Sequence, residues 1–252
     1  MPVALVTGAG SGIGRATTSL LRSDGWTVAA ADLVAPPSGG ADPAHLGIAA
    51  DVSDPAANQR MVEATLERFG SLDALVLNAG VAGSGPIDSF PLEDFERILA
   101  VDLKALVYGV RAALPALEAS GGPRSVVVTA STSGLGGDPG MWAYNSAKAG
   151  AVNLVRSLAM DLGPRHIRVN AVCPGPTVTP MTEGLRSSAP DVAAGLVDAI
   201  PLHRWGRPEE VAAAIVFLLS PAASFITGVA LPVDGGVTAT TGQFRPPPGA
   251  GA

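Results

Sequence analysis

Short apolar runs alternate along the chain with longer stretches in which apolar residues recur at helical spacing. The short runs end at Gly, Asp, Asn or Ser and are typical of strands buried on both faces of a parallel sheet. They predict strands at 3–6, 26–31, 46–50, 72–77, 125–129, 166–172 and 229–233. The longer stretches predict helices at 12–22, 55–69, 92–99, 101–117, 142–162 and 208–219.

The regular alternation of strand and helix predicts the fold class. Right-handed crossovers place successive helices on both faces of one sheet, so we predict an α/β, doubly wound parallel sheet, a Rossmann fold. One domain covers residues 1–243 in this prediction, with a mobile, partly helical substrate lid at about 180–204. The Pro- and Gly-rich tail at 244–252 is either disordered or laid across a neighbouring subunit.

Composition argues against several function classes. Hydrophobic residues make up 47% of the chain, yet no apolar run approaches the roughly 18 residues that a membrane span needs. We therefore predict a soluble, cytoplasmic protein without a membrane partner. The net charge of −6 argues against a nucleic-acid partner. The single Cys173 excludes an internal disulfide, and the three histidines lack ligand spacing, so no metal is predicted.

A glycine-rich segment follows the first predicted strand and opens the first predicted helix. Gly8, Gly12 and Gly14 stand at the spacing G-x-x-x-G-x-G, with Ser11 and Ile13 among them. Glycines let the backbone approach a pyrophosphate, and a helix N-terminus offers free N–H groups and the positive end of a dipole. These five residues predict the phosphate-binding part of a dinucleotide site.

Asp32 ends the second predicted strand, twenty residues after Gly12. A carboxylate there accepts hydrogen bonds from the ribose 2′- and 3′-hydroxyls and repels a 2′-phosphate, which favours NAD over NADP. The nearby positive charge of Arg15 keeps NADP open as an alternative. We therefore place Asp32 and Leu33 beside the adenosine ribose of NAD.

Two further strand ends extend the predicted cofactor cleft. Asp51 and Val52 follow the third strand, where a carboxylate can accept from the adenine amino group and a backbone N–H can face the ring. Asn78, Ala79 and Gly80 follow the fourth strand and are expected to line the cleft. Strand-end capping is the alternative role of both groups, so neither identifies a cofactor site alone.

Tyr144 and Lys148 lie four residues apart in the helix predicted at 142–162, so they project from one helix face. A phenol titrates near pH 10, and a neighbouring ammonium favours its ionised form. The chain holds two Tyr and two Lys, which makes this spacing rare by chance; an exposed helix pair is the structural alternative. Ser131 stands thirteen residues before Tyr144 at a strand end, where its hydroxyl can orient a substrate oxygen.

The ordered set of these features resembles the short-chain dehydrogenase/reductase family over nearly the full length, and in particular its bacterial NAD-dependent hydroxysteroid-type and secondary-alcohol dehydrogenases. The matching features are the glycine segment, Asp51-Val52, Asn78-Ala79-Gly80, Ser131 with Tyr144 and Lys148, Pro174-Gly175 and Asp234-Gly235-Gly236. The resemblance implies that Tyr144 is the general acid/base, that Lys148 favours the ionised phenol and binds ribose, and that Ser131 steadies the carbonyl.

The resemblance also implies binding residues and an assembly. It places Pro174, Gly175, Thr177 and Thr179 at the nicotinamide carboxamide, with the two threonines as donors, and it implies a homotetramer. The substrate residues that we expect are Ser131, Trp142, Tyr144, Met181 and Leu185, although Trp142 has ordinary packing as its alternative. The apolar lid and Trp142 favour a small apolar substrate of steroid-like, alicyclic or terpenoid type.

The chain departs from the family pattern at Asp102, where many members carry a catalytic Asn. The Asn acts in the family largely through its main-chain carbonyl, which holds a water in a relay to the Lys. Asp preserves that geometry and changes the local charge balance. Asp102 is therefore retained among the catalytic residues as a relay residue, and Asp102→Asn is expected to have a modest effect on turnover.

Three alternatives to an NAD-dependent secondary-alcohol dehydrogenase stay open. A 3-oxoacyl-thioester ketoreductase usually prefers NADPH and often has a basic docking face, so Asp32 and the net charge of −6 count against it. A sugar or diol dehydrogenase is favoured by a more polar lid than this one. A non-catalytic NAD-binding protein has no need for an intact Ser131, Tyr144 and Lys148.

Overall fold

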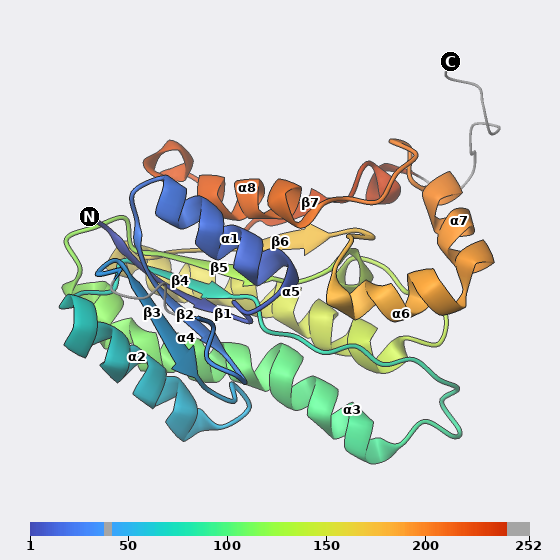
Figure 1. The fold of residues 1–252 in the computed structure, drawn as a ribbon, viewed down its shortest axis with the longest axis horizontal. Helices are drawn as coiled ribbons and strands as arrows, with labels where there is room; N and C mark the ends of the chain where they lie inside the picture. Colours follow the sequence, from blue (N-terminus) through green and yellow to red (C-terminus); the bar gives the residue numbers. More distant parts are fainter. Residues whose placement is uncertain (38–41, 241–252) are drawn as a thin grey trace.

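The computed structural model describes residues 1–37 and 42–240. Its centre is one sheet of seven parallel strands in the order β3-β2-β1-β4-β5-β6-β7 (Figure 1). This arrangement confirms the predicted Rossmann fold, whereas the tail predicted at 244–252 lies outside the described residues. The strands are β1 (Val3–Thr7), β2 (Thr27–Asp32), β3 (His45–Ala49), β4 (Ala74–Leu77), β5 (Ser125–Thr129), β6 (Arg168–Pro174) and β7 (Ala230–Val233).

The strand ends differ from the sequence prediction by at most two residues. β6 begins at Arg168 instead of residue 166 because His166 has a φ of 58°, a left-handed conformation that strands do not use. It continues to Pro174 because its pairing with β7 includes Pro174 opposite Val233. The predicted order of elements along the chain is confirmed.

Strand order reverses between β1 and β4. β1 pairs with β2 on one side and with β4 on the other, so the chain builds the sheet outward in both directions from this point. The carboxyl ends of β1, β4 and β5 meet at one sheet edge. There the Asn78 N–H donates to Thr7 Oγ1 over 3.0 Å, and Thr129 Oγ1 donates to Asn78 Oδ1 over 3.1 Å. A crevice at such an edge is where open α/β sheets bind ligands.

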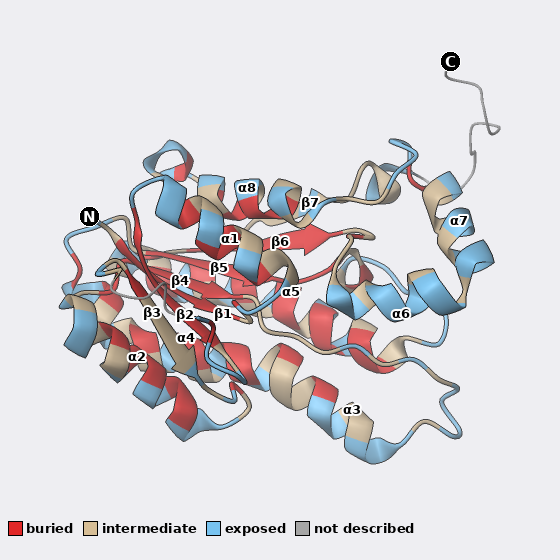
Figure 2. Cartoon of the chain, viewed as in Figure 1, coloured by how far each residue is buried: buried red, intermediate tan, exposed pale blue. Residues whose placement is uncertain are grey.

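Helices cover both faces of the sheet (Figure 1). α1 and α8 pack over one face, where Leu21 and Ile215 join the buried core; α2, α4 and α5 cover the other, with Met61, Val110 and Val155. The inner strands β1, β2, β4, β5 and β6 are almost entirely buried, whereas the edge strands β3 and β7 are mostly half-buried (Figure 2). The helices are α1 (Gly12–Ser23), α2 (Pro55–Phe69), α3 (Leu92–Leu99), α4 (Ala105–Ala119), α5 (Trp142–Leu162), α6 (Pro180–Ser188), α7 (Pro190–Ala199) and α8 (Pro208–Leu219).

The helix predicted at 101–117 begins differently in the structure. A π-helical segment, Ala100–Lys104, joins α3 directly to α4, so the two predicted helices merge into one continuous rod. Such wide turns insert one extra residue into a helix and often occur at functional sites. Asp102 lies inside this segment and is buried. Apolar periodicity does not predict the wide turn, because the spacing of apolar residues on either side of it is helical.

The predicted lid segment contains α6 and α7, so its partly helical character is confirmed. Both helices project from the body of the molecule (Figure 1) and expose much of their surface (Figure 2). Neither has a buried residue. Among all helices in the described part of the chain, none is long and apolar enough to cross a membrane.

Candidate active site

Tyr144 and Lys148 lie on one face of the first turns of α5, as their spacing predicts. Both side chains are buried, and the Lys148 Nζ atom lies 5.6 Å from the centre of the Tyr144 ring. The helix places them beside the carboxyl end of β5, because α5 packs against β6 and the turn after β5. This burial removes the alternative of an exposed helix pair.

Lys148 has two oxygen partners in addition to the neighbouring phenol. Its Nζ atom donates to the Thr129 carbonyl over 3.0 Å and lies 2.9 Å from Asp102 Oδ1. Burial by itself lowers the pKa of Lys148, but the charges of Asp102 and Tyr144 outweigh burial, so the pKa is raised. The ammonium is therefore kept charged inside the protein.

Asp102 is as deeply buried as Lys148. The Asp102 side chain is 0% exposed and that of Lys148 is 5% exposed, so water screens this ion pair little. The second carboxylate oxygen, Oδ2, accepts the Val81 N–H over 3.2 Å. A Cβ at Gly80 would lie only 2.7 Å from Asp102 Oδ1, so the backbone after β4 closes over the pair.

Ser131 follows β5 and is buried in the turn that packs against α5. Its Oγ atom accepts the Ser133 N–H over 3.1 Å and thereby caps a short 3-10 helix, Thr132–Gly134. The two neighbouring hydroxyls donate elsewhere: Thr132 to the Pro174 carbonyl, and Ser133 to Asp138. Of the three adjacent hydroxyls, the one on Ser131 has no acceptor among the described residues and is the one suited to bind a substrate oxygen.

The glycine segment forms a tight turn between β1 and α1. Gly8 has a φ of 64° and Gly12 a φ of 49°, conformations that side chains disfavour. A Cβ at Gly14 would lie 2.1 Å from the Gly8 carbonyl oxygen, so no larger residue fits there without movement. Ser11 precedes the first turn of α1, and Ile13 packs on the core beneath it. The turn lies against the end of β4, because a Cβ at Gly8 would lie 2.8 Å from the Ala79 Cα atom.

The predicted adenosine residues take part in local hydrogen bonds. Asp32 ends β2, and its carboxylate accepts the Gly10 N–H over 2.9 Å and the Leu33 N–H over 2.7 Å. This carboxylate thus ties β2 to the glycine turn. Asp51 accepts from the Ser53 backbone and hydroxyl in the turn before α2. Sequence spacing identified the positions but not these contacts.

Asn78, Ala79 and Gly80 cross the sheet edge after β4. The Asn78 side chain donates to the Thr7 and Gly8 carbonyls over 3.1 and 3.3 Å, and the Ala79 N–H donates to Thr7 Oγ1. Val52 follows β3 on the other side of β1 and β2 and is buried in the core. The strand-end hydrogen bonds of Asn78 and Ala79 are observed, and the lining of a cofactor cleft by these residues stays a prediction.

The segment after β6 is held by a threonine that sequence reasoning missed. Thr182 Oγ1 donates to the Thr177 carbonyl over 2.7 Å and accepts the Thr179 N–H over 3.1 Å. Thr177 Oγ1 itself donates to the Gly175 carbonyl over 2.9 Å. The T-x-x-T spacing across the start of α6 is the sequence signal of this capping pair.

The structure surrounds Trp142 with two aromatic residues that the sequence analysis did not select. Its ring centre lies 5.6 Å from that of Phe90 and 5.4 Å from that of Phe95. Phe95 lies on α3 and Trp142 on α5, and the loops before these two helices are joined by a hydrogen bond from the Gly85 N–H to the Gly140 carbonyl, over 2.9 Å. Packing is thus an observed role of Trp142, next to Tyr144 in the same turn.

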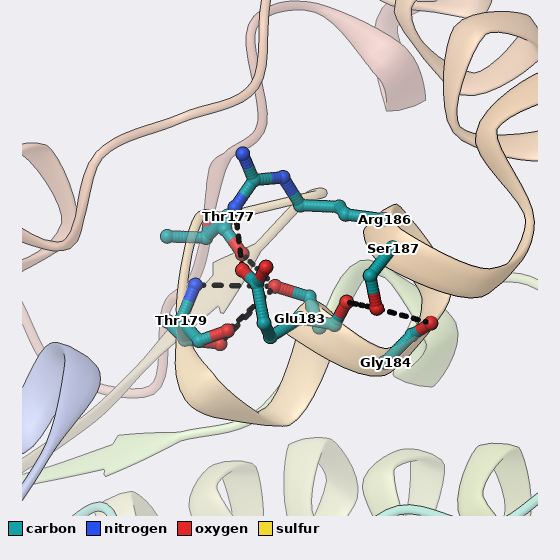
Figure 3. Close-up of polar contacts among 7 residues, drawn as sticks. Thr177, Thr179, Glu183, Gly184, Arg186 and Ser187 are labelled. Carbon is teal, nitrogen blue, oxygen red and sulfur yellow. Dashed lines mark hydrogen bonds and ion pairs between the residues drawn. The ribbon is translucent and has the colours of Figure 1, made fainter.

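The predicted lid residues are exposed. Met181 and Leu185 lie on α6 with accessible apolar side chains. Arg186, the basic residue of this helix, lies 2.9 Å from Glu183 and its guanidinium lies 5.8 Å from the centre of the Trp205 ring (Figure 3 shows the Glu183 pair). The lid therefore offers apolar surface, and its arginine is paired.

Known proteins are similar to this chain over most of its length. The family model described as Enoyl-(Acyl carrier protein) reductase matches residues 8–238. Meso-2,3-butanediol dehydrogenase of Serratia marcescens is 40% identical over 250 residues, covering 96% of each chain. Trans-4-hydroxycyclohexanecarboxylate dehydrogenase of Sinomonas cyclohexanicum is 38% identical, covering 94% of this chain and 93% of the relative.

A solved structure shares both fold and sequence. The 3-ketoacyl-(acyl-carrier-protein) reductase of Brucella melitensis, complexed with NADH, superimposes with a TM-score of 0.84 at 34% identity, covering 94% of this chain and 98% of that one. The chain belongs to the short-chain dehydrogenase/reductase family. It is accordingly an oxidoreductase of the dehydrogenase/reductase class.

Proposed function

We propose that this enzyme interconverts a secondary alcohol and a ketone on a small, largely apolar molecule, with NAD as hydride carrier. The observation that carries the proposal is the burial of Ser131, Tyr144 and Lys148 where the turn after β5 packs against α5, with Lys148 Nζ 5.6 Å from the centre of the Tyr144 ring. These residues and the partners of Lys148 come from three segments: the π-helical segment, the end of β5 with the turn after it, and α5. Chance packing does not account for a charged lysine held in this position.

The residues at the sheet edge fit a dinucleotide. The turn from Gly8 to Gly14 has no space for side chains at Gly14, and it lies against the end of β4 at the switch point of the sheet. Asp32 and Leu33 would lie at the adenosine ribose, Asp51 and Val52 at the adenine. The remaining cofactor residues of the proposal are Ser11, Gly12, Ile13, Asn78, Ala79, Gly80, Tyr144, Lys148, Pro174, Gly175, Thr177 and Thr179.

Proton exchange is assigned to Tyr144. During alcohol oxidation the Tyr144 oxygen takes the hydroxyl proton, and in ketone reduction it returns that proton. The Lys148 ammonium favours the ionised phenol, and the Ser131 hydroxyl donates to the substrate oxygen and fixes its direction. NAD supplies the hydride-accepting ring when bound.

Asp32 supports NAD over NADP, because a 2′-phosphate placed against this carboxylate would be repelled. The carboxylate already accepts two backbone N–H groups, so it is held at the end of β2. We expect Asp32→Ser to raise the ratio of kcat/KM with NADP to that with NAD by at least about tenfold. A wild-type enzyme faster with NADP would overturn this assignment.

The substrate class rests on the lining of the lid. Met181 and Leu185 expose apolar surface there, and Arg186 is paired with Glu183. An alicyclic or otherwise apolar secondary alcohol suits such a surface better than an anion. The relatives named for butanediol and for a hydroxycyclohexanecarboxylate support a small secondary alcohol.

A 3-oxoacyl-thioester reductase is the second candidate. The acyl-carrier-protein reductases among the matches favour it. The net charge of −6 and the carboxylate of Asp32 count against an acidic carrier protein and NADPH. Reduction of an acetoacetyl thioester faster than of any simple ketone would establish this alternative.

Apolar residues on exposed helix surfaces support the homotetramer that we propose. Val107 on α4, Met160 on α5 and Phe217 on α8 are all exposed in the single chain. Their burial between copies would remove apolar area from water. Light scattering of the purified protein measures the assembly directly. A cytoplasmic location is part of the same proposal.

The deciding experiment follows nicotinamide absorbance with a panel of secondary alcohols and ketones and with both cofactors. Tyr144→Phe is expected to abolish NAD-linked turnover. The matched control is Tyr108→Phe, because Tyr108 is the chain's other tyrosine and lies on α4. NADH binding without turnover on the whole panel would favour the non-catalytic alternative, and equal losses in both variants would contradict the role of Tyr144.

A further inference from the structure

The ion pair of Asp102 with Lys148 places a second charge in the proposed proton-transfer site. Asp102 comes from the π-helical segment and Lys148 from α5, and their charged atoms lie 2.9 Å apart. The side chains are 0% and 5% exposed. In such a site opposite charges act on their neighbours with little screening by water.

The charge that Tyr144 meets depends on both members of the pair. The titratable groups that face Lys148 are Asp102 from the π-helical segment, Tyr144 from α5 and Cys173 from β6. Burial raises the pKa of the Cys173 thiol to about 11, so the thiol is neutral at ordinary pH. Asp102 is therefore the carboxylate among these groups, and its negative charge offsets the ammonium.

Lys104, another charged residue of the same continuous helix, pairs with Glu96 and not with Asp102 or Lys148. Lys104, two residues after Asp102, is exposed and lies 3.4 Å from Glu96. The Asp102 carboxylate is held in place on both sides. Its Oδ2 atom accepts the Val81 N–H, and the Gly80 backbone packs against its Oδ1 atom. The carboxylate is thus fixed against Lys148.

We propose that Asp102 is a positioning residue that acts through Lys148: its carboxylate holds the ammonium in place, offsets part of its positive charge, and thereby sets the pH range in which Tyr144 exchanges its proton. The proposal deepens the function assigned above and rests on it for its catalytic meaning. A neutral residue at this position leaves the ammonium uncompensated. The phenolate of Tyr144 is then favoured at lower pH.

Ionisation of Tyr144 can be measured without substrate or cofactor. The purified protein is titrated with base while ultraviolet difference absorbance reports tyrosinate. The chain has two tyrosines, so Tyr144→Phe identifies the Tyr144 component and Tyr108→Phe removes the other. The experiment compares the Tyr144 midpoint in wild-type protein with that in Asp102→Asn. Failure of the proposed activity does not affect this readout.

We expect the Tyr144 midpoint in Asp102→Asn to fall by about one pH unit or more, because one charge of a poorly screened pair is removed. Where turnover is measurable, the acid limb of kcat for alcohol oxidation should move in the same direction. An unchanged midpoint would overturn the proposal and leave Asp102 a structural residue. A rise would also overturn it, because the carboxylate would then serve to keep Lys148 protonated.

Folding of the variant requires its own control. Both Asp102 oxygens contact a donor, and an amide provides only one acceptor oxygen, so Asp102→Asn loses one contact. Circular dichroism and thermal unfolding test whether the variant is native. If it does not fold, Asp102→Ser removes the same charge with a smaller side chain and is titrated in its place. The Lys104→Met variant changes a neighbouring exposed charge and should leave the Tyr144 midpoint unchanged.

Discussion

Lys148 and Asp102 form an ion pair with side chains 5% and 0% exposed, whereas Arg186 and Glu183 in the lid form one with side chains 36% and 63% exposed. The first pair belongs to α5 and the rod beside it, which bury many residues; the second belongs to α6, which buries none. A buried pair cannot separate without leaving an uncompensated charge, but an exposed pair exchanges readily with water.

The groups assigned to proton exchange lie in the packed region around α5, whereas the residues of the predicted lid lie on the exposed surface of α6. We expect substitutions on α6 to change substrate preference without disturbing the core. Two relatives of this chain are named as dehydrogenases of butanediol and of a hydroxycyclohexanecarboxylate.

The largest effect is expected from Lys148→Met, which leaves Asp102 buried without its partner. The free energy of unfolding should fall by about 3–5 kcal/mol, measured by urea denaturation. Turnover should fall by about 100-fold or more, since the ionised phenol loses its stabilising charge. Lys104→Met is the matched control, because this other lysine has an exposed partner and should cost less than about 1 kcal/mol. An equal loss of unfolding free energy in Lys148→Met and Lys104→Met would contradict the difference between buried and exposed ion pairs.

Gly14→Ala tests the tightly packed region of the molecule, at the glycine turn that we assign to the cofactor. The new Cβ would lie 2.1 Å from the Gly8 carbonyl oxygen, so the backbone must shift. We expect a cost of about 1–3 kcal/mol and NADH binding at least about tenfold weaker, measured by fluorescence titration. Gly184→Ala on α6 meets nothing within 4 Å and should stabilise the lid helix by up to about 1 kcal/mol. A loss of NADH affinity in Gly184→Ala would show that the two regions are coupled.

Leu185→Ala tests whether a residue of the predicted lid affects substrate binding without affecting stability. It removes apolar surface from α6, so KM for an apolar alcohol should rise about three- to tenfold, while the free energy of unfolding changes by less than about 0.5 kcal/mol. Steady-state kinetics and urea denaturation check both values. Leu92→Ala at the start of α3, a more exposed leucine outside the predicted lid, should leave KM unchanged. A drop in kcat without a change in KM would place Leu185 in the catalytic site instead.

Glu183→Gln should have the smallest effect. It breaks the exposed pair with Arg186, and such pairs contribute about 0–1 kcal/mol. Thermal unfolding should be nearly unchanged, and added salt should not distinguish the variant from the wild type. Activity on a carboxylate-bearing alcohol is the sharper readout, because a freed Arg186 would bind the carboxylate and lower KM. No change in that KM would show that Arg186 is turned away from the substrate.

Periodicity and spacing were sufficient for much of the fold. All seven strands were predicted within two residues, because strands buried on both faces require continuous apolar runs. The Tyr144 and Lys148 positions follow from a helical turn, which brings residues four apart onto one face. The wide turn at Asp102 was not predicted, because the apolar spacing on either side of it is helical, and the aromatic partners of Trp142 were not predicted, because they come from segments far apart in sequence.

The sequence by itself determined the strand–helix order, the glycine turn and the identity of the residues at each strand end, because these properties depend on neighbours along the chain. Only the tertiary structure decided how those residues meet. It brings Asp102 within 2.9 Å of Lys148, and it gives the hydroxyls beside Ser131 partners of their own. Burial is the physical reason: a charge or a hydroxyl changes its chemistry according to what surrounds it, and folding sets those surroundings.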